Sequence, residues 1–67
     1  MPLIQVSIME GRSEEKIEKL IHELTKTTAE TLGSPIENVR VLVNEMPTTH
    51  WGIAGESVAK KKSKEAN

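Results

Sequence analysis

Apolar and polar residues alternate along two stretches of the chain, residues 2–9 and 39–44. Successive side chains of a β-strand point to opposite faces, so this alternation predicts two half-buried strands. Both stretches are rich in valine and isoleucine, which favour strands. One face would carry Ile4, Val6 and Ile8 from the first strand and Val39, Val41 and Val43 from the second.

Between the strands, apolar residues recur every three or four positions, which predicts an amphipathic helix over residues 14–32. Ser13 is placed to cap its first free amides, and the glutamates that follow complement the positive end of the helix dipole. Gly33 stands where a helix commonly ends, and Pro35 follows it. The predicted apolar stripe consists of Ile17, Leu20, Ile21, Leu24, Thr28 and Leu32.

The connecting segments are predicted from their turn-forming residues. Residues 34–37, Ser-Pro-Ile-Glu, match a capping box with proline at the first helical position, and predict one short helical turn. Residues 46–55 are punctuated by proline and glycine, and predict a tight loop or small hairpin that forms an arm across a neighbouring subunit. Residues 60–67 are polar and lysine-rich, and predict a solvated or frayed tail after a domain that spans residues 1–59.

Strand, helix and strand together predict an α/β (α+β) fold, built on a right-handed β-α-β unit with parallel strands. The helix would cover one face of the two-stranded sheet, and no other segment of the chain would cover the second face. Two strands and one helix do not make a stable monomer. The open face, which carries Leu42, is therefore expected to pack on another copy of the chain.

The composition supports an oligomer and argues against several other classes of protein. The 67 residues include no cysteine, no phenylalanine, no tyrosine and one tryptophan, so neither disulfides nor an aromatic core can stabilise a monomer. The net charge of −1 argues against a general nucleic-acid-binding protein, which would be basic. Because the chain has no apolar run long enough for a membrane span and no signal-peptide pattern, we expect a cytoplasmic protein with no membrane partner.

Pro2 is the first candidate for chemistry. Methionine aminopeptidases usually remove an initiator methionine that precedes a small residue such as proline, which would leave Pro2 with a free secondary amine. An α-amino group has a reference pKa of roughly 7.7–8, and a group that titrates near neutral pH is well suited to act as a general base. Since many proteins begin Met-Pro, this dipeptide alone carries little weight.

Arg40, Arg12 and Trp51 are the other candidates. Arg40 lies in a strand expected to be apolar on both faces, so it requires a salt bridge, an exposed edge or a cavity. Arg12, in the turn before the helix, would either pair with a nearby glutamate or bind a ligand. Trp51 would anchor a subunit interface, form one wall of a dry pocket, or do both. Two guanidinium groups can bind carboxylates in bidentate fashion, and together with desolvation they would lower the pKa of the Pro2 amine.

In their joint order and spacing, these residues resemble the 4-oxalocrotonate tautomerase family of the tautomerase superfamily, over residues 2–58. The matching motifs are the Met-Pro start, Glu10-Gly11-Arg12, Val39-Arg40-Val41, Glu45-Met46, His50-Trp51-Gly52-Ile53 and Gly55-Glu56. No single motif is specific, but their shared order is. Trp51 stands where the family usually has Phe or Tyr, and the lysine-rich end extends past the usual stopping point.

The resemblance implies an isomerase without metal or organic cofactor that converts 2-hydroxymuconate-like dienols to 2-oxo acids, in the catabolism of aromatic compounds. Pro2 would be the general base and, once protonated, the general acid. Arg40 would bind the 2-oxygen and its adjacent carboxylate, and Arg12 the far carboxylate. A hexamer built as a trimer of dimers is also implied, with each site drawn from different subunits. The resemblance assigns the apolar part of the pocket to Met9, Trp51 and Ile53.

Two alternatives stay open from the sequence. Superfamily members that hydrate or dehalogenate 3-haloacrylates add a carboxylate and an extra arginine, at positions that here hold the apolar Ile53 and Met9, so this is not expected as the main activity. A non-catalytic oligomeric binding module would retain Met1. The Pro2 nitrogen would then be an amide, which cannot act as a base.

Overall fold

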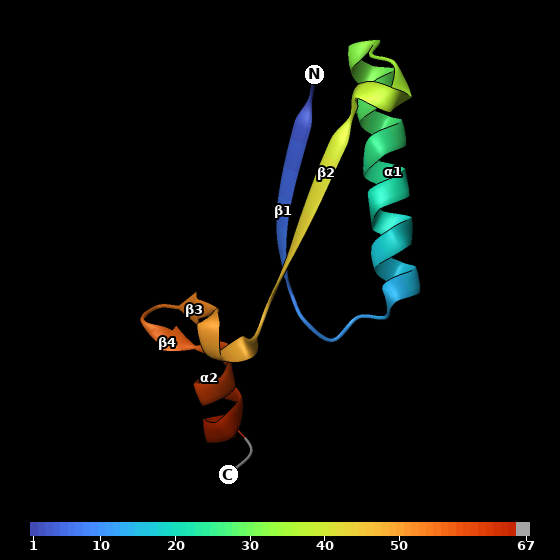
Figure 1. The fold of residues 1–67 in the computed structure, drawn as a ribbon. Helices are drawn as coiled ribbons and strands as arrows, with labels where there is room; N and C mark the ends of the chain where they lie inside the picture. The colour runs from blue at the N-terminus through green and yellow to red at the C-terminus, as the bar shows by residue number, and fades with distance from the viewer. Residues whose placement is uncertain (66–67) are drawn as a thin grey trace.

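A β-α-β unit forms the larger part of the computed structural model, which describes residues 1–65 (Figure 1). Strands β1 (Leu3–Met9) and β2 (Arg40–Met46) pair in parallel along their whole length. Helix α1 (Glu14–Leu32) connects them and runs beside β2. The predicted fold class, a β-α-β unit with parallel strands, is confirmed.

Helix α1 begins and ends at the predicted residues because both of its caps are satisfied. The Ser13 side chain accepts a hydrogen bond from the amide of Lys16 at 3.3 Å. Gly33 adopts a left-handed φ of 68°, and its amide donates to the carbonyl of Ala29. Leu32 departs from the predicted stripe, since it is 63% exposed. It lies in the last turn, which no other part of residues 1–65 covers on that side.

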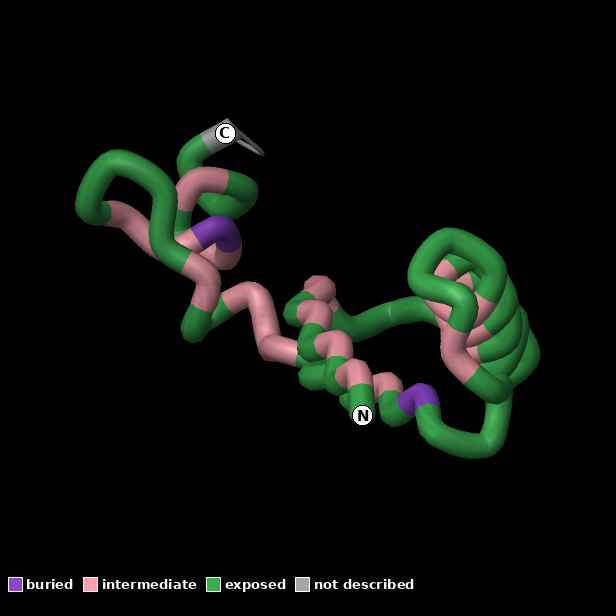
Figure 2. The backbone as a smooth tube through the Cα atoms, turned by 90° about the horizontal axis from the view of Figure 1, so that it is seen from above, coloured by how far each residue is buried: buried purple, intermediate pink, exposed green. Residues whose placement is uncertain are grey.

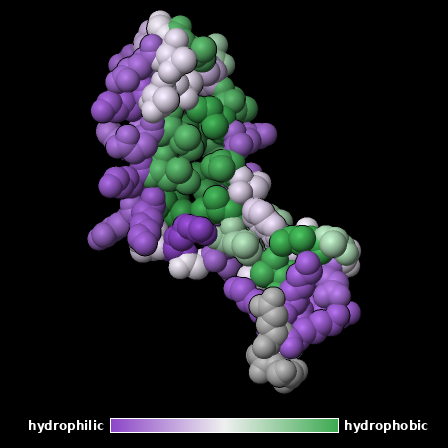
Figure 3. Space-filling model, turned by 180° about the vertical axis from the view of Figure 1, so that it is seen from behind, coloured by the Kyte–Doolittle hydropathy of each residue, from purple (hydrophilic) through white to green (hydrophobic). Residues whose placement is uncertain are grey.

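The sheet is covered on one face only. Leu42 is 48% exposed and Leu3 is 57% exposed, so the face away from α1 is open, as predicted for Leu42. Figure 3 shows an apolar band over the β1, β2 and α1 unit, with polar side chains along one border. The half-buried side chains on the covered face are Ile4, Val6, Ile8, Val41 and Val43.

A short 3₁₀ helix, η1 (Ile36–Asn38), joins α1 to β2, as the predicted helical turn. The predicted capping box is wrong, because Pro35 and not Ser34 occupies the cap position, and no side chain caps the turn. Backbone carbonyls accept hydrogen bonds from the amides of this turn instead. The amide of Ser34 donates to Ala29 at 3.1 Å, and the amide of Asn38 donates to Pro35 at 3.0 Å.

The predicted small hairpin is present beyond β2. It follows the 3₁₀ helix η2 (Thr48–His50) and consists of β3 (Gly52–Ile53) paired antiparallel with β4 (Glu56–Ser57). The two residues between these strands, Ala54 and Gly55, have φ values of 52° and 87°. Two consecutive left-handed residues are what a two-residue hairpin turn of type I′ requires.

The lysine-rich end, predicted as a solvated or frayed tail, is largely solvated but not frayed, because helix α2 (Val58–Glu65) includes most of it. The side chain of Ser57 accepts a hydrogen bond from the amide of Lys60 at 3.1 Å, which caps this helix. Lys64 and Glu56 form a salt bridge of 2.7 Å from α2 back to β4. The last part of the predicted tail, residues 66–67, lies outside the described residues. Neither α1 nor α2 is long and apolar enough to cross a membrane.

The chain is far more extended than a protein of its size that folds alone. Its radius of gyration is 15.8 Å, whereas a compact chain of this length has a value of about 11 Å. Its accessible surface is 5197 Å², against about 4,200 Å² for a folded monomer of this mass. Within residues 1–64 only Val39 and Val58 are buried, one in each part of the molecule (Figure 2). This open shape is that of a subunit whose core is completed by other copies.

Candidate active site

Pro2 lies immediately before β1 and is held by the sheet. Its carbonyl accepts a hydrogen bond from the amide of Arg40 at 3.0 Å, which extends the β1–β2 ladder by one step. Pro2 is half-buried, whereas Met1 in front of it is 83% exposed. Removal of Met1 would therefore free the Pro2 nitrogen at a position that the sheet already defines.

Arg40 is the first residue of β2, and its side chain is exposed. Its Nη1 donates to the carbonyl of Glu37 at 2.6 Å and more weakly to that of Val39 at 3.4 Å. No carboxylate pairs with it among the described residues, so of the alternatives left open for Arg40 the salt bridge is absent and the single chain shows an exposed edge. The guanidinium is thus held by backbone carbonyls, and its remaining N–H groups are available to an anion.

Arg12 occupies the turn that joins β1 to α1 and is also exposed. Its Nη1 donates to the carbonyl of Met9 at 2.9 Å, and it forms no ion pair with a glutamate in the described part of the chain. The bond to Met9 holds the guanidinium close to the carboxyl end of β1. Both arginines therefore keep an uncompensated positive charge at the surface, which fits them to bind carboxylates.

Trp51 connects η2 to the hairpin and is half-buried. Its carbonyl accepts a hydrogen bond from the amide of Val58 at 2.8 Å, which ties the tryptophan backbone to the start of α2. Ile53 lies nearby on β3 and is 47% exposed. The arm thus presents an aromatic and an aliphatic side chain that are both incompletely covered in one chain.

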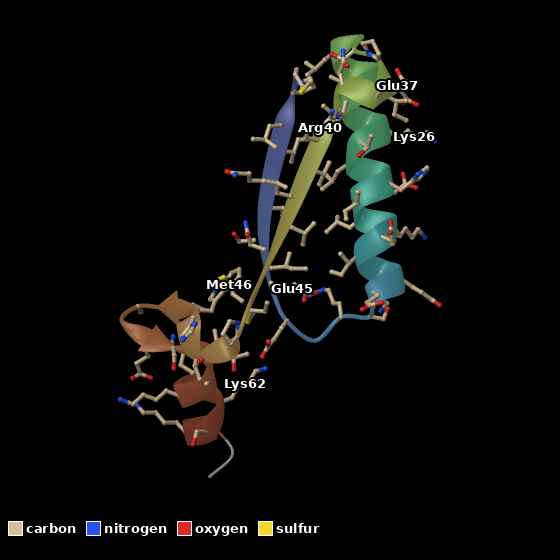
Figure 4. The ribbon with its side chains drawn as sticks, viewed as in Figure 1. Lys26, Glu37, Arg40, Glu45, Met46 and Lys62 are labelled. Carbon is tan, nitrogen blue, oxygen red and sulfur yellow. The ribbon has the colours of Figure 1, made fainter. Side chains whose placement is uncertain are left out.

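A single chain does not bring these candidates together. Pro2 and Arg40 lie at one end of the β1–β2 ladder, whereas Arg12 and the arm follow the other end. Figure 4 shows Arg40 and Met46 at opposite ends of β2. Since β1 has seven residues, the two ends are roughly 20 Å apart. Pro2 and Arg40 also belong to opposite faces of the sheet. Pro2 is on the face of Ile4, whereas Arg40 is on the face of Leu42. A pocket that contains all the candidates must therefore draw on more than one chain.

A groove within the described part of the chain is not this site. Its volume is about 470 Å³, and it lies between the first half of α1 and strand β2. None of the candidate residues lines it. Its walls are Glu14, Ile17, Glu18, Ile21, Val43 and Glu45, and the acidic side chains make it a poor place for an anionic substrate.

The β-α-β unit with parallel strands matches the fold of solved 4-oxalocrotonate tautomerase structures. The chain belongs to the tautomerase family, since the family model described as tautomerase enzyme matches residues 2–61. It is accordingly an enzyme of the isomerase class.

Individual relatives agree with this assignment. A probable tautomerase from Ralstonia nicotianae is 51% identical over 65 residues, which is 97% of this chain and 90% of that protein. A 2-hydroxymuconate tautomerase from Pseudomonas putida is 48% identical over 60 residues, with 90% and 95% covered.

Solved structures agree as well. A 4-oxalocrotonate tautomerase homologue of the tomaymycin biosynthetic pathway superimposes with a TM-score of 0.89 at 45% identity, over 92% of this chain and 95% of that one. A heterohexameric 4-oxalocrotonate tautomerase from Chloroflexus aurantiacus gives a TM-score of 0.85 at 35% identity, with 90% and 97% covered.

Proposed function

We propose that this tautomerase converts 2-hydroxymuconate, or a similar 2-hydroxy dienol dicarboxylate, to the conjugated 2-oxo acid through the amine of Pro2. The observation that supports it best is the position of Pro2, which the ladder bond to Arg40 holds at the start of β1. The 2-hydroxymuconate tautomerase from Pseudomonas putida, at 48% identity, supports the choice of substrate. Another relative belongs to a biosynthetic pathway, so the proposal concerns a substrate class and not a pathway.

In the proposed reaction the Pro2 amine accepts the proton of the 2-hydroxyl group. The electrons of the breaking O–H bond form the carbonyl and shift the conjugated double bond, and the prolyl ammonium returns the proton to the distant carbon. Arg40 stabilises the negative charge that develops on the 2-oxygen and binds the adjacent carboxylate. Arg12 binds the far carboxylate, and no atoms are gained or lost.

The active assembly is proposed to be a hexamer, a trimer of dimers. The open sheet face with Leu42, the excess surface of the chain and the separation of the candidates support an oligomer. A relative with a TM-score of 0.85 is a heterohexamer, which supports six subunits. In such an assembly the arm of one chain brings Trp51 and Ile53 to the Pro2 end of another, and closes the pocket with apolar side chains.

The test is ultraviolet-monitored ketonisation of 2-hydroxymuconate by wild type and by Pro2→Ala. After removal of Met1, Pro2→Ala keeps a primary amine in place of the rigid secondary amine of proline, so kcat should fall but not vanish, by up to the roughly 100-fold that a well-placed general base contributes. Alanine is also small, so Met1 should be removed from both proteins, and intact mass verifies this. Equal rates would refute the role of Pro2. An inactive wild type with a free Pro2 would refute the substrate, and one that retains Met1 would support a non-catalytic module.

A further inference from the structure

Charge is divided unevenly between the two parts of this chain. Residues 1–46 carry eight glutamates against five basic side chains, whereas residues 47–67 carry four lysines against two glutamates. The dicarboxylate proposed above is a dianion, so the β-α-β unit as a whole repels it. Residues 47–67, the arm together with helix α2, are the part of the subunit that attracts it.

The positive charge of residues 47–67 is concentrated on α2. Lys64 is neutralised by its salt bridge to Glu56. Lys60 and Lys62 are exposed and Lys61 is half-exposed, and within the described part of the chain no carboxylate pairs with any of the three. Three ammonium groups without a carboxylate partner among the side chains of residues 1–64 therefore lie on consecutive residues of one short helix.

This helix is anchored to the proposed wall of the pocket. The amide of Val58, its first residue, donates to the carbonyl of Trp51 at 2.8 Å, and the Val58 side chain is only 8% exposed. Since α2 has eight residues, the whole helix lies within about 12 Å of that point. Figure 4 shows Lys62 at this end of the molecule, far from Arg40. The three lysines therefore stay close to Trp51 in whatever position the assembly holds the arm.

We propose that Lys60, Lys61 and Lys62 form an electrostatic collar that concentrates the dianionic substrate at the pocket mouth. The collar does not touch the reacting atoms, so it raises kcat/KM and leaves kcat unchanged. If the length of α2, about 12 Å, is taken as the separation between the three charges and a dianion, they raise its local concentration about tenfold at 10 mM ionic strength and about twofold at 150 mM. This inference rests on the proposed function, because it requires a dicarboxylate substrate.

The experiment measures kcat and KM for 2-hydroxymuconate between 10 and 150 mM ionic strength, for wild type and the triple variant K60Q/K61Q/K62Q. The matched control is K16Q/K19Q/K26Q, which removes the same charge from exposed positions on α1. We expect the α2 variant to lose about tenfold in kcat/KM at 10 mM and about twofold at 150 mM. The α1 control should lose clearly less. For a 2-hydroxydienoate with a single carboxylate, the kcat/KM of the α2 variant should fall only about threefold at 10 mM, because the charge of this substrate is half as large.

A charge-conserving variant, K60R/K61R/K62R, separates electrostatics from folding and should keep the wild-type salt dependence. If the α2 variant and the α1 control lose the same factor, or if the arginine variant loses as much as the glutamine one, the collar is refuted. If kcat falls and KM does not change, the lysines act within the pocket, and the collar is again refuted. Failure of the proposed function is distinguishable, since wild type itself would then not turn over 2-hydroxymuconate.

Discussion

Replacement of Leu42 by glutamate tests the central structural conclusion, that the open face of the sheet is a subunit contact. Leu42 is 48% exposed in the single chain, and burial of a whole leucine contributes about 1.5–3 kcal/mol. Burial of the exposed half of the Leu42 side chain in the contact therefore stabilises it by about 1 kcal/mol. Glutamate forfeits this and places an unpaired carboxylate there, which costs about 3 kcal/mol or more. A combined loss of about 4 kcal/mol raises a dissociation constant about a thousandfold.

Sedimentation velocity between 0.1 and 100 µM protein measures the dissociation, and ketonisation rates at the same concentrations measure its effect on the site. We expect Leu42→Glu to dissociate at concentrations where wild type is assembled, and to lose activity in parallel, because one chain does not bring the candidates together. Thr27→Glu is the control, since it adds the same charge to an exposed position on α1. If Leu42→Glu sediments and reacts like this control, the open face is not a subunit contact.

Two further predictions concern the arginines and the caps of α1. Arg12→Ala should raise KM for 2-hydroxymuconate about tenfold or more with little change in kcat. Arg40→Ala should lower kcat as well, because its proposed role is to bind the oxygen on which charge develops. Steady-state kinetics measure both effects, and an unchanged kcat in Arg40→Ala would contradict that role. Ser13→Ala and Gly33→Ala should each lower the free energy of unfolding by about 1 kcal/mol per subunit. Urea denaturation at one fixed protein concentration measures this. If neither variant is less stable than wild type, the caps do not limit the stability of α1.

Local signals predicted most of the β-α-β unit. Helix α1 has caps at both ends and a regular apolar period, and its bounds, Glu14–Leu32, agree with the prediction. The strands are less sharply bounded, because their ends depend on pairing with each other. β2 begins at Arg40 and continues to Met46, past the predicted end at residue 44. The alternation still predicted the open face correctly, since parity does not depend on where a strand ends.

The errors arose where two local signals competed. Ser34 resembles a helix cap, but its amide donates to the carbonyl of Ala29 at the end of α1. The carbonyl of Pro35 accepts from the amide of Asn38 and closes the following turn. The lysine-rich end was taken as a tail on composition. Ser57, a polar residue directly before Val58 and Ala59, was the signal for a capped helix, and the Lys64–Glu56 salt bridge adds a tertiary contact that composition cannot show.

The residues proposed for the site came from the sequence, but their arrangement did not. The Met-Pro start, the two arginines and Trp51 are recognisable as residue types in an ordered pattern. That Pro2 and Arg12 lie at opposite ends of a ladder roughly 20 Å long follows only from the parallel pairing of β1 and β2. A pocket that no chain contains by itself cannot be located from one sequence, whatever its motifs.

The separation of Pro2 from Arg12 along β1 has a genetic consequence. In the proposed assembly, where each site draws on more than one chain, a mutation at either end damages one partner in every site that the chain helps to build, but leaves its other end intact. When chains damaged at opposite ends are made in one cell and assemble together, some sites receive an intact Pro2 from one chain and an intact Arg12 from the other. Two defective alleles can therefore complement each other, and after gene duplication each copy is free to specialise at one end of the ladder.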